Sequence, residues 1–503
     1  MNKPSSKKII KSILKDEGFV IAKPDVSILD EPISVEDIPK IHNIETDEIQ
    51  KENLKIEKLQ TEIKSLPKEE KKKTKLEIEK SKQQEETSVD EDIKTIVKYL
   101  NWHIDRISSF VIGRRDIIEQ AFFGILTGEH LLMLSRTGMA KSYLTNYIFD
   151  SFEHVRIFAT QASKDQTPDN YFGPYNIEEF KKGRIRHNLH GSIIEANFVF
   201  LDEFFDASDV VLRSLLSVLN ERKFINGQEQ VDCAIHSAIA TANYMRMNEV
   251  TEAVLDRFLF RAIIPEDSNS FNKFLIDQSY LKTSGKLIEP KRRTPFARIK
   301  YLHRIIKNRD PEIKIIIPDV ILYMKNIIIE KFVGEMRKHD YHFFISPRKQ
   351  AKTINFLRAS ALLDGRLEVN ESDLERLYLV VCTLNSYIST KSRDKTEKDI
   401  YLDIYNQTMN QFKIADAYVQ IEGLLKIRHL FEEVVANPDM KEQIQQHSGL
   451  PGVLNFLKNI FSGKKSEEYT LQRLYQSVSD IRPANQEVDE LKKGILLTYR
   501  TIL

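Results

Sequence analysis

The chain has 503 residues, enough for about two to four domains with buried cores of their own. Its 75 basic and 74 acidic side chains give a formal net charge of +1, which excludes a strong overall charge for holding nucleic acid or an anionic membrane. The two cysteines, Cys233 and Cys382, lie far apart and outside any C-x-x-C motif, which argues against a disulfide framework or a zinc site.

The chain shows no apolar signal segment at its start, and its most apolar run, residues 314–325, is too short to span a bilayer. These features predict a soluble protein in the reducing cytoplasm, without a transmembrane segment.

Residues 1–88 form a densely charged segment with few aromatic residues. Five apolar residues in it follow a heptad-like spacing that stops at Pro67: Ile49, Ile56, Leu59, Ile63 and Leu66. Two interpretations remain open. The segment is either a largely disordered arm or a short helix that binds a partner or another copy of the chain.

A folded α/β domain is predicted over residues 89–270. Four short apolar runs recur there, separated by stretches with helical periodicity: "HLLMLS" (130–135), "HVRIFAT" (154–160), "ANFVFLDE" (196–203) and "HSAIATAN" (236–243). This alternation is typical of a mainly parallel sheet covered by helices. Beyond residue 270 amphipathic helical patterns dominate, including residues 347–363 and 452–461, so the second half is predicted to be mostly α-helical.

The stretch "SRTGMAKS" (135–142) is close to the phosphate-binding template G-x-x-x-x-G-K-[ST] and lies between a predicted strand and a predicted helix. Ser135 and Ala140 stand where the template has glycine. We expect Ala140 to begin the following helix in a helical conformation, and Ser135 to cause a tolerable distortion. The predicted nucleotide-binding residues of the loop are Ser135, Arg136, Thr137, Gly138, Met139, Ala140, Lys141, Ser142 and Tyr143.

Acidic and amide side chains follow the next predicted strands. Asp202 and Glu203 end an apolar run, where carboxylates are costly to bury unless they hold a cation or a water molecule. Asp202 together with Ser142 is therefore predicted to bind Mg²⁺, and Glu203 to act as a general base. The alternative is a helix cap followed by a surface acid. Asn243 is either a water-orienting side chain or an ordinary turn residue.

Together, "SRTGMAKS", "FVFLDE", "AIATANY", "LDRFLFR" and "ISPRKQAKTINFLRASALLDGR" resemble the AAA+ ATPases, most closely the MoxR group and its RavA-like branch. The resemblance covers about residues 92–385. It implies an α/β AAA+ P-loop core at 89–270 and a helical lid at 271–390. The helical C-terminal region predicted at 391–503 rests on the amphipathic patterns alone and lies outside the resemblance. In this family alanine precedes the lysine, as it does here, but glycine usually stands at the position of Ser135.

The resemblance also implies roles for single residues. Arg257 matches the arginine finger that acts on ATP held by a neighbouring subunit, with Arg261 as a weaker rival. Arg348 matches the sensor 2 arginine of the lid, and Asn243 matches sensor 1. The turn Val111, Ile112 and Gly113 would lie beside the adenine base. For both Arg257 and Arg348 the alternative is a structural ion pair.

Two features depart from the family or stay open. Asp206 stands where relatives often carry a basic residue. Residues 171–196 contain a basic cluster, Lys181, Lys182, Arg184 and Arg186, and correspond either to the inserted hairpin of MoxR-like proteins or to a solvated loop.

The leading functional hypothesis is an ATP- and Mg²⁺-dependent ring ATPase, a homo-hexamer that remodels or matures a protein client. The family often works with von Willebrand factor A (vWA) domain proteins. One alternative is a nucleotide-gated assembly scaffold with weak hydrolysis. The other, a nucleic-acid-associated AAA+ motor, is disfavoured by the balanced charge.

Overall fold

The computed structural model describes residues 93–183, 186–226, 229–244, 253–264, 269–283, 286–339, 341–382, 396–414, 417–436 and 471–500. The predicted arm at 1–88, Arg184 and the helical pattern at 452–461 lie outside these residues. The chain divides into two units. One holds the described residues up to Tyr99 together with those of Asp277–Glu289, and the other holds the described residues of Leu100–Ile276 and Pro290–Leu503.

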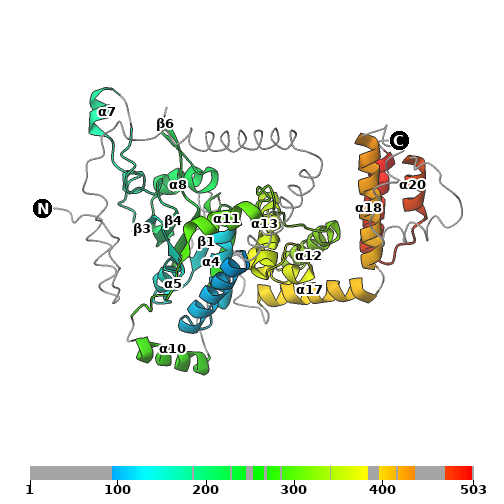
Figure 1. Ribbon diagram of the computed structural model, residues 1–503, viewed down its shortest axis with the longest axis horizontal. Helices are drawn as coiled ribbons and strands as arrows, with labels where there is room; N and C mark the ends of the chain where they lie inside the picture. Colours follow the sequence, from blue (N-terminus) through cyan, green and yellow to red (C-terminus); the bar gives the residue numbers. More distant parts are fainter. Residues whose placement is uncertain are drawn as a thin grey trace, which may run out of the picture. The chain divides into compact units, whose positions relative to one another are not determined.

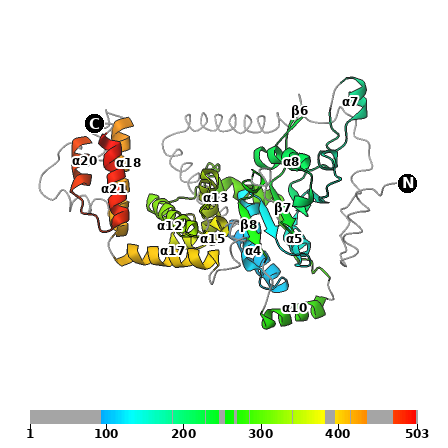
Figure 2. The same cartoon turned by 180° about the vertical axis from the view of Figure 1, so that it is seen from behind.

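A five-stranded parallel sheet of order β3-β4-β7-β1-β8 forms the centre of the α/β part (Figures 1 and 2). Its strands are β1 (Leu131–Leu134), β3 (Ile157–Gln161), β4 (Phe198–Asp202), β7 (Ser237–Ala242) and β8 (Phe260–Ile263). Two short pairs stand apart from it: β2 (Phe152–Glu153) with β9 (Thr294–Pro295), and β5 (Lys223–Asn226) with β6 (Glu229–Asp232). The four predicted runs are thus confirmed as β1, β3, β4 and β7.

Helices cover both faces of this sheet, which explains why its central strands are apolar along their whole length. Alternate strand residues, among them Leu132, Leu201 and Ala240, share one core with Leu212 and Leu215 of α8 (Asp209–Glu221). The other face is covered by α4 (Arg115–Thr127), which contacts β1, β7 and β8, and by α5 (Lys141–Phe149), which contacts β4 and β7. The predicted α/β core with a parallel sheet is confirmed.

The second half is helical, as predicted. Its helices are α10 (Ser270–Thr283), α11 (Phe296–Ile306), α12 (Asp319–Arg337), α13 (Pro347–Leu363), α14 (Glu371–Glu375), α15 (Tyr378–Val381), α17 (Glu397–Ile414), α18 (Ala417–Ala436), α20 (Leu471–Asp480) and α21 (Gln486–Arg500). Helix α13 contacts α4 and α11 of the core, and α17 and α18 pack on α12. No helix in the described ranges is long and apolar enough to cross a membrane.

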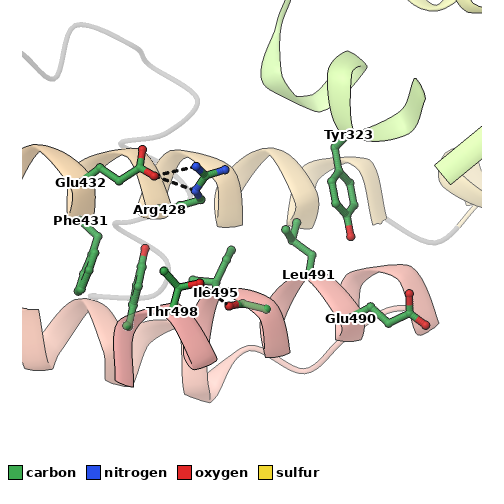
Figure 3. A pocket seen from close by; sticks show the side chains of 10 residues that line it. Tyr323, Arg428, Phe431, Glu432, Glu490, Leu491, Ile495 and Thr498 are labelled. Atoms are coloured by element: carbon green, nitrogen blue, oxygen red, sulfur yellow. Dashed lines mark hydrogen bonds and ion pairs between the residues drawn. The ribbon is translucent and has the colours of Figure 1, made fainter. Parts of the chain in front are cut away.

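A hollow of about 530 Å³ lies between α12, α18 and α21 (Figure 3). Phe431, Leu491 and Ile495 give it an apolar wall, and the Arg428–Glu432 ion pair lies on its rim. It contains none of the predicted site residues, so the chemistry described below does not depend on it.

The segment 171–196 leaves the core and returns. Its two arms pair in antiparallel fashion, because Asn176 N donates to Arg186 O (2.7 Å) and Asn188 N donates to Pro174 O (2.7 Å). Between the arms lies α7 (Ile177–Lys181), capped by the Asn176 side chain, and α6 (Asp169–Phe172) precedes the first arm. The inserted hairpin is therefore present as two paired arms with a short helix between them. Lys182 of the basic cluster pairs with Glu179 (2.9 Å).

Two half-buried histidines, His236 and His303, lie at the edge of the sheet opposite the loop 135–140. His236 bonds the carbonyl of Ile125, and His303 bonds the carbonyl of Leu126. Burial, reinforced by neighbouring positive charges, lowers the pKa of His236 to about 3 and that of His303 to about 4. These side chains are therefore neutral in the folded protein at neutral pH.

Acid is expected to destabilise the protein between about pH 6.5 and pH 4. Because the folded-state pKa of His236 lies below its unfolded value, the unfolded chain binds the extra proton, and stability is lost as pH falls. For one such histidine the loss at pH 5 is on the order of 2 kcal/mol. Urea unfolding at pH 7 and pH 5 measures it. His236→Gln should reduce this pH dependence, whereas the exposed control His190→Asn should not; equal slopes in all three proteins would contradict the assignment.

Candidate nucleotide site

The candidate site lies at the carboxyl ends of β1, β7 and β4, which are neighbours in the sheet. Strand β1 runs into the loop that begins at Ser135, β4 ends at Asp202, and β7 is followed by Asn243. The amide of Ser135 donates to the carbonyl of Ala242 (3.1 Å), which fastens the start of the loop to the end of β7. Ligands of open α/β sheets bind at this edge.

The loop residues Arg136 to Ala140 connect β1 to the first turn of α5. The first N–H groups of a helix have no partner within the helix and can bind an anion. Gly138 has φ +82°, and a Cβ built there would meet nothing within 4 Å. The concave side of the loop at this residue is thus open. The loop geometry fits the phosphate-binding role that the motif predicts.

Ala140 does not have the helical conformation that the sequence predicted. It has φ 58° and ψ 32°, in the left-handed region, and α5 begins one residue later at Lys141. An alanine in this region is strained by contact of its Cβ with the following carbonyl. The common template has glycine at this position because the backbone there is left-handed, and in this chain an alanine adopts the same conformation.

Ala140→Gly is expected to stabilise the protein by about 1 kcal/mol, because glycine adopts this conformation without steric strain. The comparison is the urea-unfolding free energy of the variant and the parent. Ala351→Gly, at an exposed position inside α13, serves as the control and should destabilise by about 1 kcal/mol. Destabilisation of similar size by both substitutions would show that Ala140 is unstrained.

Ser135 causes less disturbance than expected. It does not belong to the positive-φ residues, so its backbone needs no glycine. Its side chain is 2% exposed, and its hydroxyl donates to the carbonyl of Arg136 (3.0 Å). The serine is accommodated as a buried, hydrogen-bonded residue at the start of the loop.

Hydroxyl oxygens of two side chains lie next to the Asp202 carboxylate. The hydroxyl of Ser142 lies 3.3 Å from Asp202 Oδ2, and the hydroxyl of Thr241 donates to Asp202 Oδ1. A hydroxyl and a carboxylate, with phosphate oxygens and water, form the donor set that Mg²⁺ prefers. The predicted metal pair is thus adjacent and chemically suitable. Among the described residues no cluster of three His, Cys, Asp or Glu side chains forms a separate metal site.

Asn243 joins the loop lysine to the acidic residue. The ammonium of Lys141 donates to Asn243 Oδ1 (2.5 Å) and approaches the carbonyl of Ser135 (3.3 Å), while Asn243 Nδ2 donates to Glu203 Oε1. Glu203 itself has φ 51°, a strained conformation for a residue with a side chain. Three predicted residues from three separate segments therefore form one hydrogen-bonded chain.

The charges of this chain are perturbed. Burial raises the pKa of Glu203, with a further contribution from the Asp202 charge, while Lys141 and Asn243 act in the opposite direction. Burial lowers the pKa of Lys141, and the charges of Glu203 and Asp202 offset part of that effect. A carboxylate with a raised pKa accepts a proton more readily than an exposed one.

The predicted adenine-side turn lies between the helix that ends at residue 110 and α4. Val111 is buried, and Gly113 has φ 71°, where glycine is favoured. Phe110 stacks on Tyr147 of α5 with ring centroids 5.6 Å apart, and Tyr147 also bonds the hydroxyl of Tyr143 (3.0 Å). The turn is thus held beside the helix that follows the loop.

Arg257 lies in the turn between residues 253–255 and β8, outside the hydrogen-bonded chain of the loop. Its guanidinium donates to the carbonyl of Ala253 (2.7 Å), and its Nε is buried without a hydrogen-bond partner among the described residues. Arg261, the rival finger, donates instead to the carbonyls of Leu255 (2.7 Å) and Phe258 (3.2 Å). Arg261 therefore fastens the turn, which leaves Arg257 as the better candidate.

Arg348 lies in the first turn of α13 and meets the same turn of the core. It donates to Asp256 Oδ2 (3.0 Å), while the Ser346 hydroxyl, which caps α13, donates to Asp256 Oδ1 (2.9 Å). The ion-pair alternative for Arg348 thus has a definite partner. Asp206 accepts a hydrogen bond from the hydroxyl of Tyr244, so an acidic residue here has a tyrosine partner.

Sequence reasoning missed Thr241, Asp256 and Ser346. Thr241 is two residues before Asn243, and side chains two apart on a strand share a face, so the pattern could have identified it. The contact of Asp256 with the lid joins residues 92 apart in the chain, for which no local signal exists.

Two parts of the chain match known protein families. Residues 98–290 match the family described as "MoxR domain in the MoxR-vWA-beta-propeller ternary systems", and residues 317–386 match the family described as "AAA lid domain". The second match contains helices α12 to α15. Together the two matches support a MoxR-type AAA+ ATPase with its lid, although neither distinguishes the RavA-like branch.

Similar proteins occur in an archaeon, in a bacterium and in Acidianus two-tailed virus. An uncharacterized protein of Methanocaldococcus jannaschii is 28% identical over 277 residues, which are 54% of this chain and 67% of that protein. Chaperone MoxR1 of Mycobacterium tuberculosis is 25% identical over 179 residues, 34% of this chain and 45% of that protein. A crystal structure from Cytophaga hutchinsonii is 16% identical with a TM-score of 0.49, covering 65% of this chain and 98% of that chain.

Proposed function

We propose that this chain, whose matches to a MoxR domain and an AAA lid lie within residues 98–386, is a Mg²⁺-dependent ATPase. The observation that carries the proposal is the hydrogen-bonded chain from Lys141 through Asn243 to Glu203, beside the Ser142–Asp202 pair. A half-buried acid with a raised pKa, linked to a phosphate-loop lysine, is typical of a hydrolytic site.

Each residue has a definite task in this proposal. Lys141 and the N–H groups at the start of α5 would hold the phosphates of ATP, and Ser142 with Asp202 would hold Mg²⁺, which neutralises phosphate charge when bound. Glu203 accepts a proton from the attacking water. Asn243 fixes the orientation of the Glu203 carboxylate through its own amide. Thr241 fixes Asp202 in the same manner.

The proposed enzyme works as a ring, a homo-hexamer in the cytoplasm, in which Arg257 completes the site of the neighbouring subunit. Among the described residues of its own subunit, Arg257 has a backbone carbonyl at hydrogen-bond distance, and Arg348 is bonded to Asp256. A planar, permanently charged guanidinium suits the charge that develops on a phosphoryl group during transfer.

The proposed client is a protein, with a vWA-domain protein as the partner. The support is the family match, whose description places its MoxR domains in systems with vWA and β-propeller proteins. Affinity capture with the Glu203→Gln form in the presence of ATP tests this, because a slowed site prolongs partner binding. Captured proteins without any vWA domain would contradict the partner proposal and leave the ATPase proposal intact.

Steady-state ATP hydrolysis tests the activity. The parent protein with Mg²⁺ should release phosphate at least about 100-fold faster than Glu203→Gln, which removes the base but keeps a side chain of the same shape. Removal of Mg²⁺ with a chelator should abolish the difference. If the two proteins release phosphate at the same rate while both bind ATP, the chain is a nucleotide-gated scaffold rather than an ATPase.

A further inference from the structure

Asp256 is the one described carboxylate that contacts both arginines assigned to catalysis. Its Oδ2 accepts a hydrogen bond from Arg348 (3.0 Å) and lies 3.9 Å from the guanidinium of Arg257. Its Oδ1 accepts the Ser346 hydroxyl (2.9 Å). One carboxylate thus joins the first turn of a lid helix to the neighbour-facing arginine of the core.

The surroundings make this contact sensitive to the lid. Asp256 and Arg257 project from a turn that Arg261 fastens through the carbonyls of Leu255 and Phe258, so the turn itself is rigid. Ser346 and Arg348 belong to the first turn of α13, whose positive N-terminal end also attracts the carboxylate. Motion of α13 therefore changes the partners of Asp256 without moving the turn.

Competition for one oxygen then couples the two arginines. Arg348 occupies Oδ2 at hydrogen-bond distance, and Arg257 is held at a longer distance from the same atom. Withdrawal of Arg348 removes the arginine that is hydrogen-bonded to this oxygen and strengthens the attraction of Arg257 to it. The Arg257 guanidinium also donates to the carbonyl of Ala253 (2.7 Å), so its approach to Asp256 competes with that hydrogen bond.

We propose that Asp256 is a positioning residue. It determines the position of the guanidinium of Arg257, the arginine given to the neighbouring subunit, according to where the lid holds Arg348. This inference rests on the proposed function, and it adds a path from the lid of one subunit to hydrolysis in the next. The path needs no contact between the two nucleotide sites other than Arg257 itself.

The experiment uses Asp256→Asn, which keeps an oxygen for the Ser346 hydroxyl but removes the charge that attracts both arginines. We expect ATP affinity within about threefold of the parent and a hydrolysis rate lower by roughly tenfold or more. Asp256→Glu, which retains the charge, should recover most of the rate. The control is Glu129→Gln, which breaks a different core-to-α13 ion pair, Glu129–Lys352 (2.6 Å), and should leave the rate nearly unchanged.

Mixed rings separate a neighbour effect from an effect on the subunit's own site. Asp256→Asn subunits keep Glu203, and Glu203→Gln subunits keep a correctly set Arg257, so mixing the two should restore part of the hydrolysis. No recovery in mixed rings, or an equal loss of rate in Glu129→Gln, would overturn the proposal. An Arg257→Ala and Glu203→Gln mixture run in parallel reports on the shared site itself, so failure of the proposed function is recognised separately.

Discussion

Lys141→Ala should lower the affinity for ATP by on the order of 100-fold, because the substitution removes a charged group that would bond the phosphates. The ammonium is already positioned for this by Asn243 and by the carbonyl of Ser135. Burial lowers the pKa of this ammonium, and an anion placed beside it would offset that effect. Titration with a fluorescent ATP analogue gives the dissociation constant.

The control for this substitution is Lys182→Ala, which removes an exposed lysine paired with Glu179 and should leave ATP affinity unchanged. Melting temperatures without nucleotide show whether Lys141→Ala remains folded. A folded Lys141→Ala protein that binds ATP as tightly as the parent would refute the loop assignment, and with it the proposed site.

The parts of the site that could be predicted from the sequence are those specified by residues close together in the chain. The phosphate-binding segment is predicted by a stretch of about 20 residues that contains an apolar strand, a loop with lysine and serine, and a helix. The apolar run that ends at Asp202 and Glu203 likewise carries its own signal. Because carboxyl ends of adjacent parallel strands meet at one edge, these local signals also predict that Lys141, Glu203 and Asn243 converge.

The backbone of the loop was harder to predict. The sequence suggested that Ala140 continues the helix, since alanine is the best helix former, but the observed φ of 58° shows that the geometry of the loop overrides this preference. Conversely, Ser135 was expected to distort the chain and does not, because its φ lies outside the positive range. Propensity describes the residue alone, whereas the neighbouring strands impose the dihedral angles.

The contacts between core and lid could not be predicted at all. Arg348 with Asp256 and Lys352 with Glu129 pair residues 92 and 223 positions apart. Arg261 illustrates the difficulty, because its sequence context also allows the role of a finger, although less readily than that of Arg257. Its hydrogen bonds to the carbonyls of Leu255 and Phe258 show that it stabilises the turn. Such pairings depend on how α13 docks on the core.

Arg257→Ala should bind ATP almost as tightly as the parent and hydrolyse it on the order of 1,000-fold more slowly, because a finger from a neighbouring subunit acts mainly on the transition state. In its own chain this guanidinium donates to the carbonyl of Ala253 (2.7 Å) and lies 3.9 Å from Asp256. Binding titration and phosphate release on the same preparation measure the two effects. Arg261→Ala differs, because loss of its carbonyl contacts should lower the melting temperature.

Mixing Arg257→Ala with Glu203→Gln tests whether the site is shared. Each protein alone should be inactive, one for want of the finger and the other for want of the base. In a randomly mixed ring about a quarter of the adjacent pairs combine an intact Glu203 in one subunit with an intact Arg257 in the next, so hydrolysis should partly return. An arginine that served only its own subunit could not complement in this manner. If mixed rings form, as cross-linking of two differently tagged variants would show, and phosphate release stays at the level of either variant alone, then Arg257 acts within its own chain and the ring mechanism is wrong for this protein.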